Sequence, residues 1–227
     1  MMYCKFFIII LFVVFCLNAK SFPIPNNDKA KFDIVRKNKV IGSHEIYFIK
    51  SDDEILIKTN IDIKVKVLFI PAYKFSHKST ETWVNGNFIS IDAYTDFEDE
   101  REYFIKGKDE ENNFVATGMD GKLLLDKNIL PSNFWNIDIL KEKELFDTQK
   151  GIIRTIKVKK LGMDTIEING KKIECKKFTM DASTNPKDKG PFPKYTLWYT
   201  KDNELMKFKF KNWKDKKIVT IIRNDLD

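Results

Sequence analysis

A strict two-residue alternation of apolar and polar side chains does most to narrow the folds open to this chain. From position 55 to position 67, every odd position carries isoleucine, valine or threonine, while the even positions are mostly lysine, aspartate or asparagine. Successive side chains of a β-strand point to opposite faces of the sheet. The pattern therefore predicts a long strand with one buried face and one solvent-exposed face.

Similar runs, separated by turn residues, surround this segment. Strands are predicted at 40–49 and 72–84 on either side of it, with Pro71 at the break. Asn85-Gly86 is a strong hairpin signal because both positions of a type I′ turn need a positive φ. Further strands are predicted at 88–95, 102–106, 152–161, 165–168, 172–180, 195–199, 204–213 and 216–223. One helix is expected, over 131–147, with Ser132 or Asn133 as its N-cap.

Consecutive hairpins with almost no helix indicate a mainly β fold built on a single antiparallel sheet. Around ten amphipathic strands cannot form a flat sheet, because each strand twists relative to its neighbour. The sheet is expected to curve into a half-barrel or a barrel-like meander, with a sandwich as the other solution. Residues 22–227 are expected to form this single domain.

The N-terminus has the pattern of a secretory signal peptide. A short basic start, Met1 to Lys5, precedes an apolar run over 6–17 that is too short to cross a bilayer as a helix. Small residues follow, so cleavage is expected after Ser21 or Ala19. The alternative is a retained N-terminal anchor. A cleaved signal at 1–21 places the mature protein in the periplasm or outside the cell, with Cys175 as its single cysteine.

The formal net charge of +7 raises the question of an anionic partner. Only four of the basic residues are arginine, the side chain whose planar fork suits phosphate and base recognition. The sequence therefore argues against nucleic-acid binding. Weak contact with an anionic membrane surface is the remaining expectation.

Aromatic residues gather on one face of the strand predicted at 72–84. That face carries Tyr73, Phe75, His77, Ser79, Glu81 and Trp83. Other large aromatic side chains could join the same interior: Phe48, Phe69, Trp135, Trp198, Phe208 and Phe210. Such a face either fills a solid core or forms the wall of a pocket for an acyl chain or similar ligand.

His44 and His77 are the only histidines, so any imidazole chemistry must use them. Their spacing matches no zinc signature, and the chain contains neither a Gly-x-Ser-x-Gly elbow nor a Ser-x-x-Lys motif. Accordingly, no catalytic residue, metal or cofactor is assigned. A buried structural histidine is favoured, and the alternative is a metal-dependent or acid–base hydrolase that uses His44, His77 and Glu81.

Several short segments together resemble an uncharacterised family of exported proteobacterial proteins that carry a domain of unknown function. The segments are 32–44, 73–83, 130–136, 147–151 and 197–199. In outline this family is similar to the lipoprotein carriers that hold acyl chains in a half-barrel. The resemblance implies a curved-sheet fold over about residues 31–223 and brings no established activity.

The leading hypothesis is an exported, soluble protein without enzymatic activity. Its curved sheet would hold an apolar ligand or the lipid moiety of a partner. The candidate ligand-binding residues are His44, Tyr73, Phe75, His77, Glu81, Trp83, Trp135 and Trp198. Besides the hydrolase, the remaining alternative is an envelope assembly or interaction factor that pairs with another chain through a sheet edge.

Overall fold

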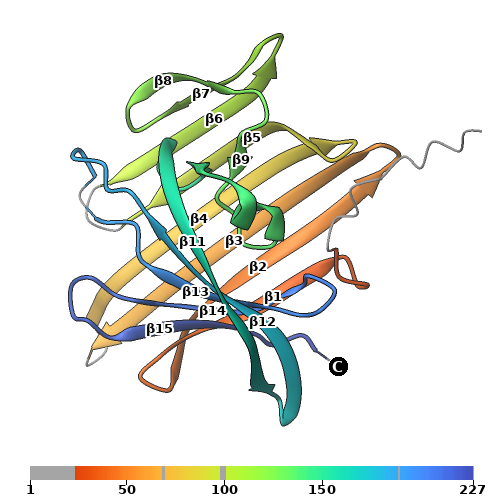
Figure 1. Cartoon of the computed structure of the whole chain (residues 1–227). Helices are drawn as coiled ribbons and strands as arrows, with labels where there is room; N and C mark the ends of the chain where they lie inside the picture. Colours follow the sequence, from red (N-terminus) through yellow and green to blue (C-terminus); the bar gives the residue numbers. More distant parts are fainter. Residues whose placement is uncertain (1–23, 68–69, 98–100, 189, 227) are drawn as a thin grey trace, which may run out of the picture.

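The computed structural model describes residues 24–67, 70–97, 101–188 and 190–226. Within these residues, fifteen strands form one sheet in the order β8-β7-β6-β5-β4-β3-β2-β1-β15-β14-β13-β12-β11-β10-β9 (Figure 1). All neighbouring strands run antiparallel except β9 and β10, which are parallel. The prediction of a mainly β fold on one curved antiparallel sheet is confirmed. The predicted signal peptide lies outside the described residues.

The sheet has two halves that meet where β1 pairs with both β2 and β15. The first half comprises β1 Lys29–Arg36, β2 Lys39–Ser51, β3 Glu54–Val67, β4 Ile70–Val84, β5 Asn87–Asp96, β6 Glu102–Glu110, β7 Asn113–Gly118 and β8 Gly121–Asp126. The second comprises β9 Leu130–Pro131, β10 Glu144–Asp147, β11 Ile152–Ile168, β12 Lys171–Ala182, β13 Tyr195–Tyr199, β14 Leu205–Lys211 and β15 Ile218–Arg223.

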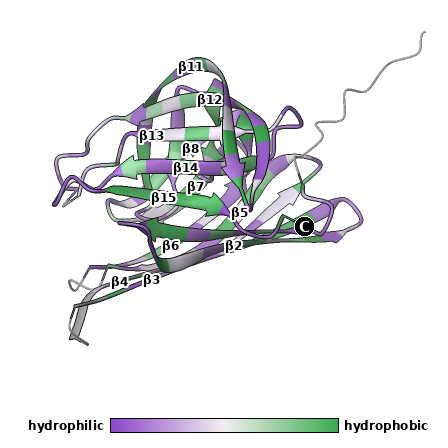
Figure 2. Cartoon of the chain, turned by 90° about the horizontal axis from the view of Figure 1, so that it is seen from below, coloured by the Kyte–Doolittle hydropathy of each residue, from purple (hydrophilic) through white to green (hydrophobic). Residues whose placement is uncertain are grey.

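Curvature folds the second half over the first. β11 to β15 cross in front of β1 to β4 in Figure 1, and the view from below shows them stacked over β2 to β6 (Figure 2). The apolar faces of both halves turn inward, so one main hydrophobic core lies between them. The alternation read from the sequence is thus the alternation between this interior and solvent.

The segment from 131 to 147 is not the predicted helix. It contains a single 3₁₀ turn, η1 Ile137–Lys141, whose N-cap Asn136 accepts a hydrogen bond from the Asp138 N–H at 3.0 Å. The flanking residues are extended and pair with each other, as the Ser132 N–H donates to Phe146 O at 2.8 Å. Burial of Trp135 and Phe146 inside the curved sheet outweighs the local preference for a longer helix.

The number of strands is also larger than the sequence pattern indicates. β7 and β8 were not predicted, and the two strands expected at 152–161 and 165–168 are one strand, β11. The chain passes through Gly162 with a φ of 97°, at a bulge in its pairing with β12. Because a bulge shifts the alternation by one residue, the pattern on either side looks like two separate strands.

The two ends of the open sheet come into contact. The Met119 N–H, just beyond β7, donates to Lys150 O at 2.7 Å. A Cβ added to Gly118 would lie 2.4 Å from the Gly151 Cα, so the two backbones approach as closely as glycine permits. The curved sheet therefore almost closes into a barrel. Within the described part of the chain, no helix has the length and apolar character needed to cross a membrane.

Candidate functional site

A cavity of about 510 Å³ lies between the two halves of the sheet. Its volume falls in the range of about 300–1,000 Å³ that is usual for small-molecule sites. The inner faces of β1 to β4 and of β13 to β15 line it, together with the segment at 132–135 and the loop at 190–193. The sequence left open whether the aromatic interior is solid or hollow, and the structure shows that part of it is hollow.

Strand register determines which side chains line the first wall of the cavity. His44 of β2 lies opposite Ile61 of β3, which lies opposite His77 of β4. Since alternate residues of a strand share a face, Ser79 and Glu81 face the cavity together with His77. This wall is therefore polar in the middle.

The second wall of the cavity is apolar. It is formed by β1, β14 and β15 and is called the apolar wall below. Its members are Ile34, Phe208, Phe210, Val219 and Ile221. A ligand in the cavity would thus meet hydrocarbon and aromatic rings on one side and polar groups on the other.

Glu81 marks the inner end of the cavity, and its side chain is almost completely buried. Its Oε2 accepts hydrogen bonds from Trp83 Nε1 at 3.0 Å and from Asn133 Nδ2 at 2.8 Å. Burial raises the pKa of this carboxyl to about 7, although both hydrogen bonds act to lower it. Trp135 packs against Trp83 at 5.4 Å between ring centroids and closes this end.

Both histidines are buried and neutral at pH 7. His44 lies between the rings of Phe32 and Phe208, at centroid distances of 5.5 and 6.0 Å, and burial lowers its pKa to about 4. His77 Nδ1 lies 2.8 Å from Thr95 Oγ1, and burial, with a smaller effect from His44, lowers its pKa to about 3. The predicted buried placement of both histidines is confirmed.

The structure does not assemble His44, His77 and Glu81 into one catalytic group. Ile61 separates the two histidines across the sheet. Glu81 lies four residues from His77 along β4, which corresponds to about 13 Å. Within the described residues, no three His, Cys, Asp or Glu side chains are placed to share a metal ion.

The opposite end of the cavity is its mouth, where Tyr73 and Trp213 are 38% and 45% exposed. Basic side chains line the mouth, and some of them already have acidic partners. Arg36 forms an ion pair with Asp215, and Lys150 forms one with Asp188. The mouth therefore differs from the inner end, which is lined by uncharged polar groups and Glu81.

A buried ion-pair network fixes the loop beside the mouth. Arg154 donates from Nε to Asp147 Oδ2 at 2.9 Å and from Nη2 to Asp188 Oδ2 at 2.6 Å. Its guanidinium also lies over the ring of Phe192 at 5.4 Å. Sequence reasoning did not find this network, because its members come from three separate segments and match no motif.

Most of the predicted site residues do meet at the cavity. Tyr73 and Phe75 line it toward the mouth, whereas Trp135 lines the inner end. Trp83 does not line the cavity; it lies in the core and donates a hydrogen bond to the carboxyl of Glu81. Phe69, which was expected in the same interior, lies outside the described residues.

Trp198 is a correction, because it faces away from the cavity. In the register of β13 and β14 it lies opposite Lys207, which places it on the outer, lysine-rich face. Its Nε1 donates to Asp164 Oδ2 at 2.9 Å, and its ring is buried in a second apolar cluster with Cys175 and Met206. β13 is buried on both faces, so hydrophobicity alone did not show which side is the interior.

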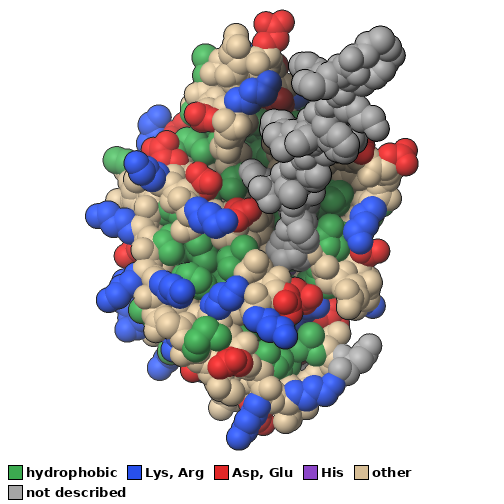
Figure 3. All heavy atoms as spheres, turned by 45° about the vertical axis from the view of Figure 1, so that its right-hand side comes forward, with side chains coloured by type: hydrophobic (Ala, Val, Ile, Leu, Met, Phe, Trp, Pro, Cys, Tyr) green, Lys and Arg blue, Asp and Glu red, His purple; other side chains and the backbone are tan. Residues whose placement is uncertain are grey.

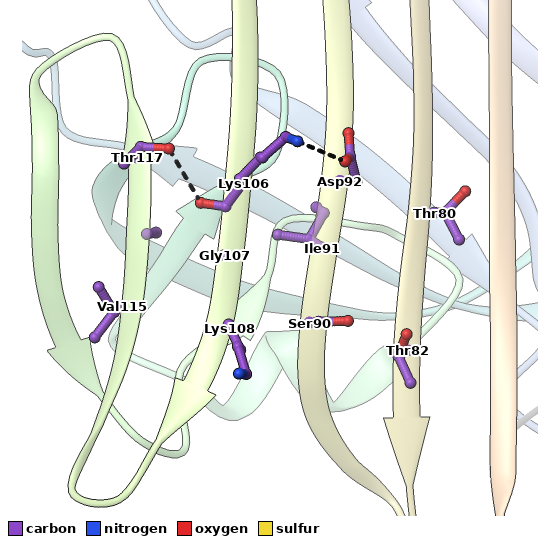
Figure 4. A pocket seen from close by; sticks show the side chains of 11 residues that line it. Thr80, Thr82, Ser90, Ile91, Asp92, Lys106, Gly107, Lys108, Val115 and Thr117 are labelled. Atoms are coloured by element: carbon purple, nitrogen blue, oxygen red, sulfur yellow. Dashed lines mark hydrogen bonds and ion pairs between the residues drawn. The ribbon is translucent and has the colours of Figure 1, made fainter.

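The outer face of β4 to β7 carries a second, open depression (Figure 4). Short polar side chains such as Thr80, Thr82 and Ser90 line it. Lys106 Nζ lies 3.5 Å from Asp92 Oδ2 across its floor. Neither of these charged side chains is buried, so this depression lacks the desolvated polar groups found in the cavity.

One face of the protein carries charges of both signs without a field of a single sign (Figure 3). On the face drawn in Figure 3, basic and acidic side chains are interspersed with small apolar areas, and no histidine is visible. This agrees with the burial of His44 and His77.

An open antiparallel sheet curled around a cavity defines a barrel-like β-protein. The chain belongs to the domain of unknown function family DUF6134, whose model matches residues 32–223. It is similar in structure to a β-barrel-like protein of the domain of unknown function DUF1849 from Brucella abortus, with a TM-score of 0.59 and 12% sequence identity over 87% of this chain and 98% of that one. At this identity the likeness concerns the fold. Among curated proteins, the sequence search finds no match.

Proposed function

We propose that this protein binds an apolar or amphipathic small molecule, or the lipid moiety of a partner, in the cavity between the two halves of its sheet. The observation that carries the proposal is a cavity of about 510 Å³ with an apolar wall and a narrow set of polar groups opposite it. Ligand sites commonly combine a mostly apolar lining with a few polar groups that orient the ligand.

The apolar wall supplies the free energy of binding. Each Å² of apolar ligand surface removed from water contributes ~25 cal/mol, so a ligand that buries about 300 Å² gains roughly 7 kcal/mol before the entropy of binding is subtracted. That gain is enough for useful affinity without any ion pair. Phe208 and Phe210 provide much of this surface because both rings face the cavity.

We further propose that binding takes place in the periplasm or outside the cell. This part rests on the signal-peptide pattern of residues 1–21. Cys175, the cysteine within the described residues, is buried and unpaired, and burial raises the pKa of its thiol to about 11. A thiol held protonated in this way resists oxidation, which suits an oxidising compartment.

Native mass spectrometry of the purified protein tests the proposal directly. The spectrum is recorded before and after extraction with organic solvent, and again after incubation with a lipid extract. We expect an apolar molecule to co-purify, to leave on extraction and to bind again. A protein that is ligand-free throughout, and that takes up nothing from the extract, would overturn the proposal.

A further inference from the structure

Four buried polar side chains form a line along the first wall of the cavity. We call this line the polar track. Its members, with their exposed fractions, are His44 at 8%, Thr59 at 7%, Ser79 at 6% and Glu81 at 1%. They come from β2, β3 and β4, and all four line the cavity. From His44 to Glu81 the track spans two strands and four residues, or about 16 Å between Cα atoms.

The polar track has hydrogen-bonding capacity that the described part of the chain does not use. No described residue forms a side-chain hydrogen bond with His44, Thr59 or Ser79. Glu81 has both of its hydrogen bonds at Oε2, which leaves Oε1 without one. Buried polar groups are nearly always paired, and a buried polar group without a partner costs free energy.

Two other buried polar side chains of the protein, by contrast, are paired within the chain. His77, next to the track, is paired with Thr95, and Arg154 is paired with two carboxylates. Among the described residues, a buried side-chain atom without a hydrogen bond also occurs away from the cavity, at Asp109 Oδ1, but Arg36 Nε and Asn133 Oδ1 belong to residues that line it. The track adds imidazole, hydroxyl and carboxyl groups to this unused capacity, at positions that a ligand in the cavity can reach.

We propose that the polar track binds an uncharged hydrogen-bonding group of the ligand, such as a hydroxyl or an amide, while the ligand's hydrocarbon lies on the apolar wall. The inference rests on the proposed function, since it says which chemical class of ligand the cavity takes. The buried end of the ligand is then polar, and a plain alkyl chain end is excluded from it.

The surroundings of the track explain why the bound group is uncharged. The track contains no lysine or arginine, and the basic side chains that line the cavity, such as Arg36 and Lys214, lie toward its mouth. Burial keeps both histidines neutral at pH 7, with the pKa of His44 lowered to about 4. A carboxylate or phosphate in the track would therefore meet Glu81 without a cation to balance either charge.

A plain hydrocarbon in the track is unfavourable for a different reason. It would remove water from Thr59, Ser79 and the Glu81 carboxyl without offering a hydrogen bond in return. A hydroxyl both donates and accepts, so it can pair with an imidazole nitrogen, a hydroxyl or a carboxyl oxygen. The polar track therefore selects ligands by their polar group. The apolar wall selects them by the length of their hydrocarbon chain.

Three probes with the same twelve-carbon chain test the inference: 1,2-dodecanediol, dodecanoate and 1-dodecene. Their affinities for the purified, delipidated protein are measured at pH 8 by displacement of a fluorescent apolar dye. We expect the diol to bind about tenfold more tightly than either of the others. Equal or tighter binding of dodecanoate or 1-dodecene would overturn the inference and leave the proposed function standing. If neither the dye nor any probe binds, the proposed function itself is wrong.

Variants of the track separate hydrogen bonding from simple filling of the cavity. Thr59→Val combined with Ser79→Ala is expected to weaken diol binding about tenfold and not to weaken 1-dodecene binding, because the variant lacks the hydroxyls that a hydrocarbon leaves unpaired. Thr80→Ala is the matched control, because Thr80 lies next to Ser79 on β4 and lines the outer depression instead of the cavity (Figure 4). Thr59→Val alone, which keeps the side-chain shape, serves if the double variant does not fold. Diol affinity equal to that of the unaltered protein in either variant would contradict the proposal.

Discussion

The indole Nε1 of Trp83 donates a hydrogen bond to Glu81 Oε2 at 3.0 Å, and both side chains lie on the inner face of β4. Asn133, from the segment before η1, donates to the same oxygen at 2.8 Å. One carboxyl oxygen thus joins the sheet to the segment that closes the inner end of the cavity. The other oxygen, Oε1, forms no hydrogen bond with a side chain of the described residues.

The raised pKa of Glu81 predicts a pH dependence of stability. The pKa of this carboxyl is about 7 in the folded protein against 4.5 as a reference for the unfolded chain. Between these values the folded state keeps a proton that the unfolded state has lost, so stability falls as the pH rises from about 4.5 to 7. Glu81→Gln keeps the side-chain shape and removes this titration.

We expect the Glu81→Gln variant to gain about 2 kcal/mol relative to the unaltered protein between pH 5 and pH 7. Urea unfolding at several pH values measures the difference. The matched control is Glu102→Gln, at the start of β6, where the side chain is exposed. A stability difference that does not change with pH would show that the Glu81 carboxyl is already ionised at pH 5.

The lowered pKa of His77 predicts that stability changes with pH in the direction opposite to that caused by Glu81. Its folded pKa of about 3 lies below the reference value of 6.5, so the unfolded chain takes up a proton that the buried imidazole refuses. Stability from this source is present above about pH 6.5 and is lost as the pH falls toward 3. Between pH 6.5 and pH 5, the free energy of unfolding of the His77→Gln variant should fall by about 2 kcal/mol less than that of the unaltered protein. Identical pH profiles for the two proteins would contradict the buried neutral state of His77.

The unused hydrogen-bonding capacity of the polar track predicts that one polar-to-apolar change stabilises the ligand-free protein. Thr59→Val keeps the volume and removes a buried hydroxyl, so we expect a gain of about 1 kcal/mol in the free energy of unfolding. Thr80→Val on the outer face is the control and should change stability by less than about 0.5 kcal/mol. A loss of stability in Thr59→Val would mean that its hydroxyl is already paired in the empty cavity.

The contact between the two ends of the sheet can be tested at Gly118. A methyl group there would lie 2.4 Å from backbone atoms of Gly151, and backbone cannot move aside as a flexible side chain can. We expect Gly118→Ala to lower the free energy of unfolding by about 2 kcal/mol or more, as measured by thermal unfolding. Gly170→Ala, in open space but at a φ of 77°, should lose only about 1 kcal/mol. Similar small losses in both variants would show that the ends of the sheet are not held together.

The curved sheet and much of its inner face could be predicted from the sequence, because the two-residue alternation of β3 and β4 reports directly which side is buried. Phe75, His77 and Glu81 were placed on the inner face on that basis, His44 was named with them as a candidate ligand-binding residue, and all four line the cavity. The alternation does not show how far apart the two halves of the sheet lie. Whether the interior is filled or hollow depends on how far β14 and β15 lie from β3 and β4, and this distance is set by the whole sheet.

The errors have physical causes of their own. Trp198 belongs to a strand buried on both faces, where alternation carries no information about inside and outside. The segment 131–147 has residues compatible with a helix, but pairing of β9 with β10 and burial of Trp135 prevail over local preference. The ion pairs of Arg154 depend on contacts between segments that are distant in the sequence, so no local sequence pattern predicts them.

The central claim is that a ligand occupies the space between the two halves of the sheet, and a pair of adjacent substitutions on β15 tests it most directly. Val219 lines the cavity, whereas Thr220 points to the opposite face. The measurement is the affinity of the purified protein for a fluorescent apolar dye in Val219→Phe and in Thr220→Phe. We expect Val219→Phe to fill part of the cavity and to weaken binding at least tenfold, with Thr220→Phe binding as the unaltered protein does. Equal affinity in both variants would contradict the account.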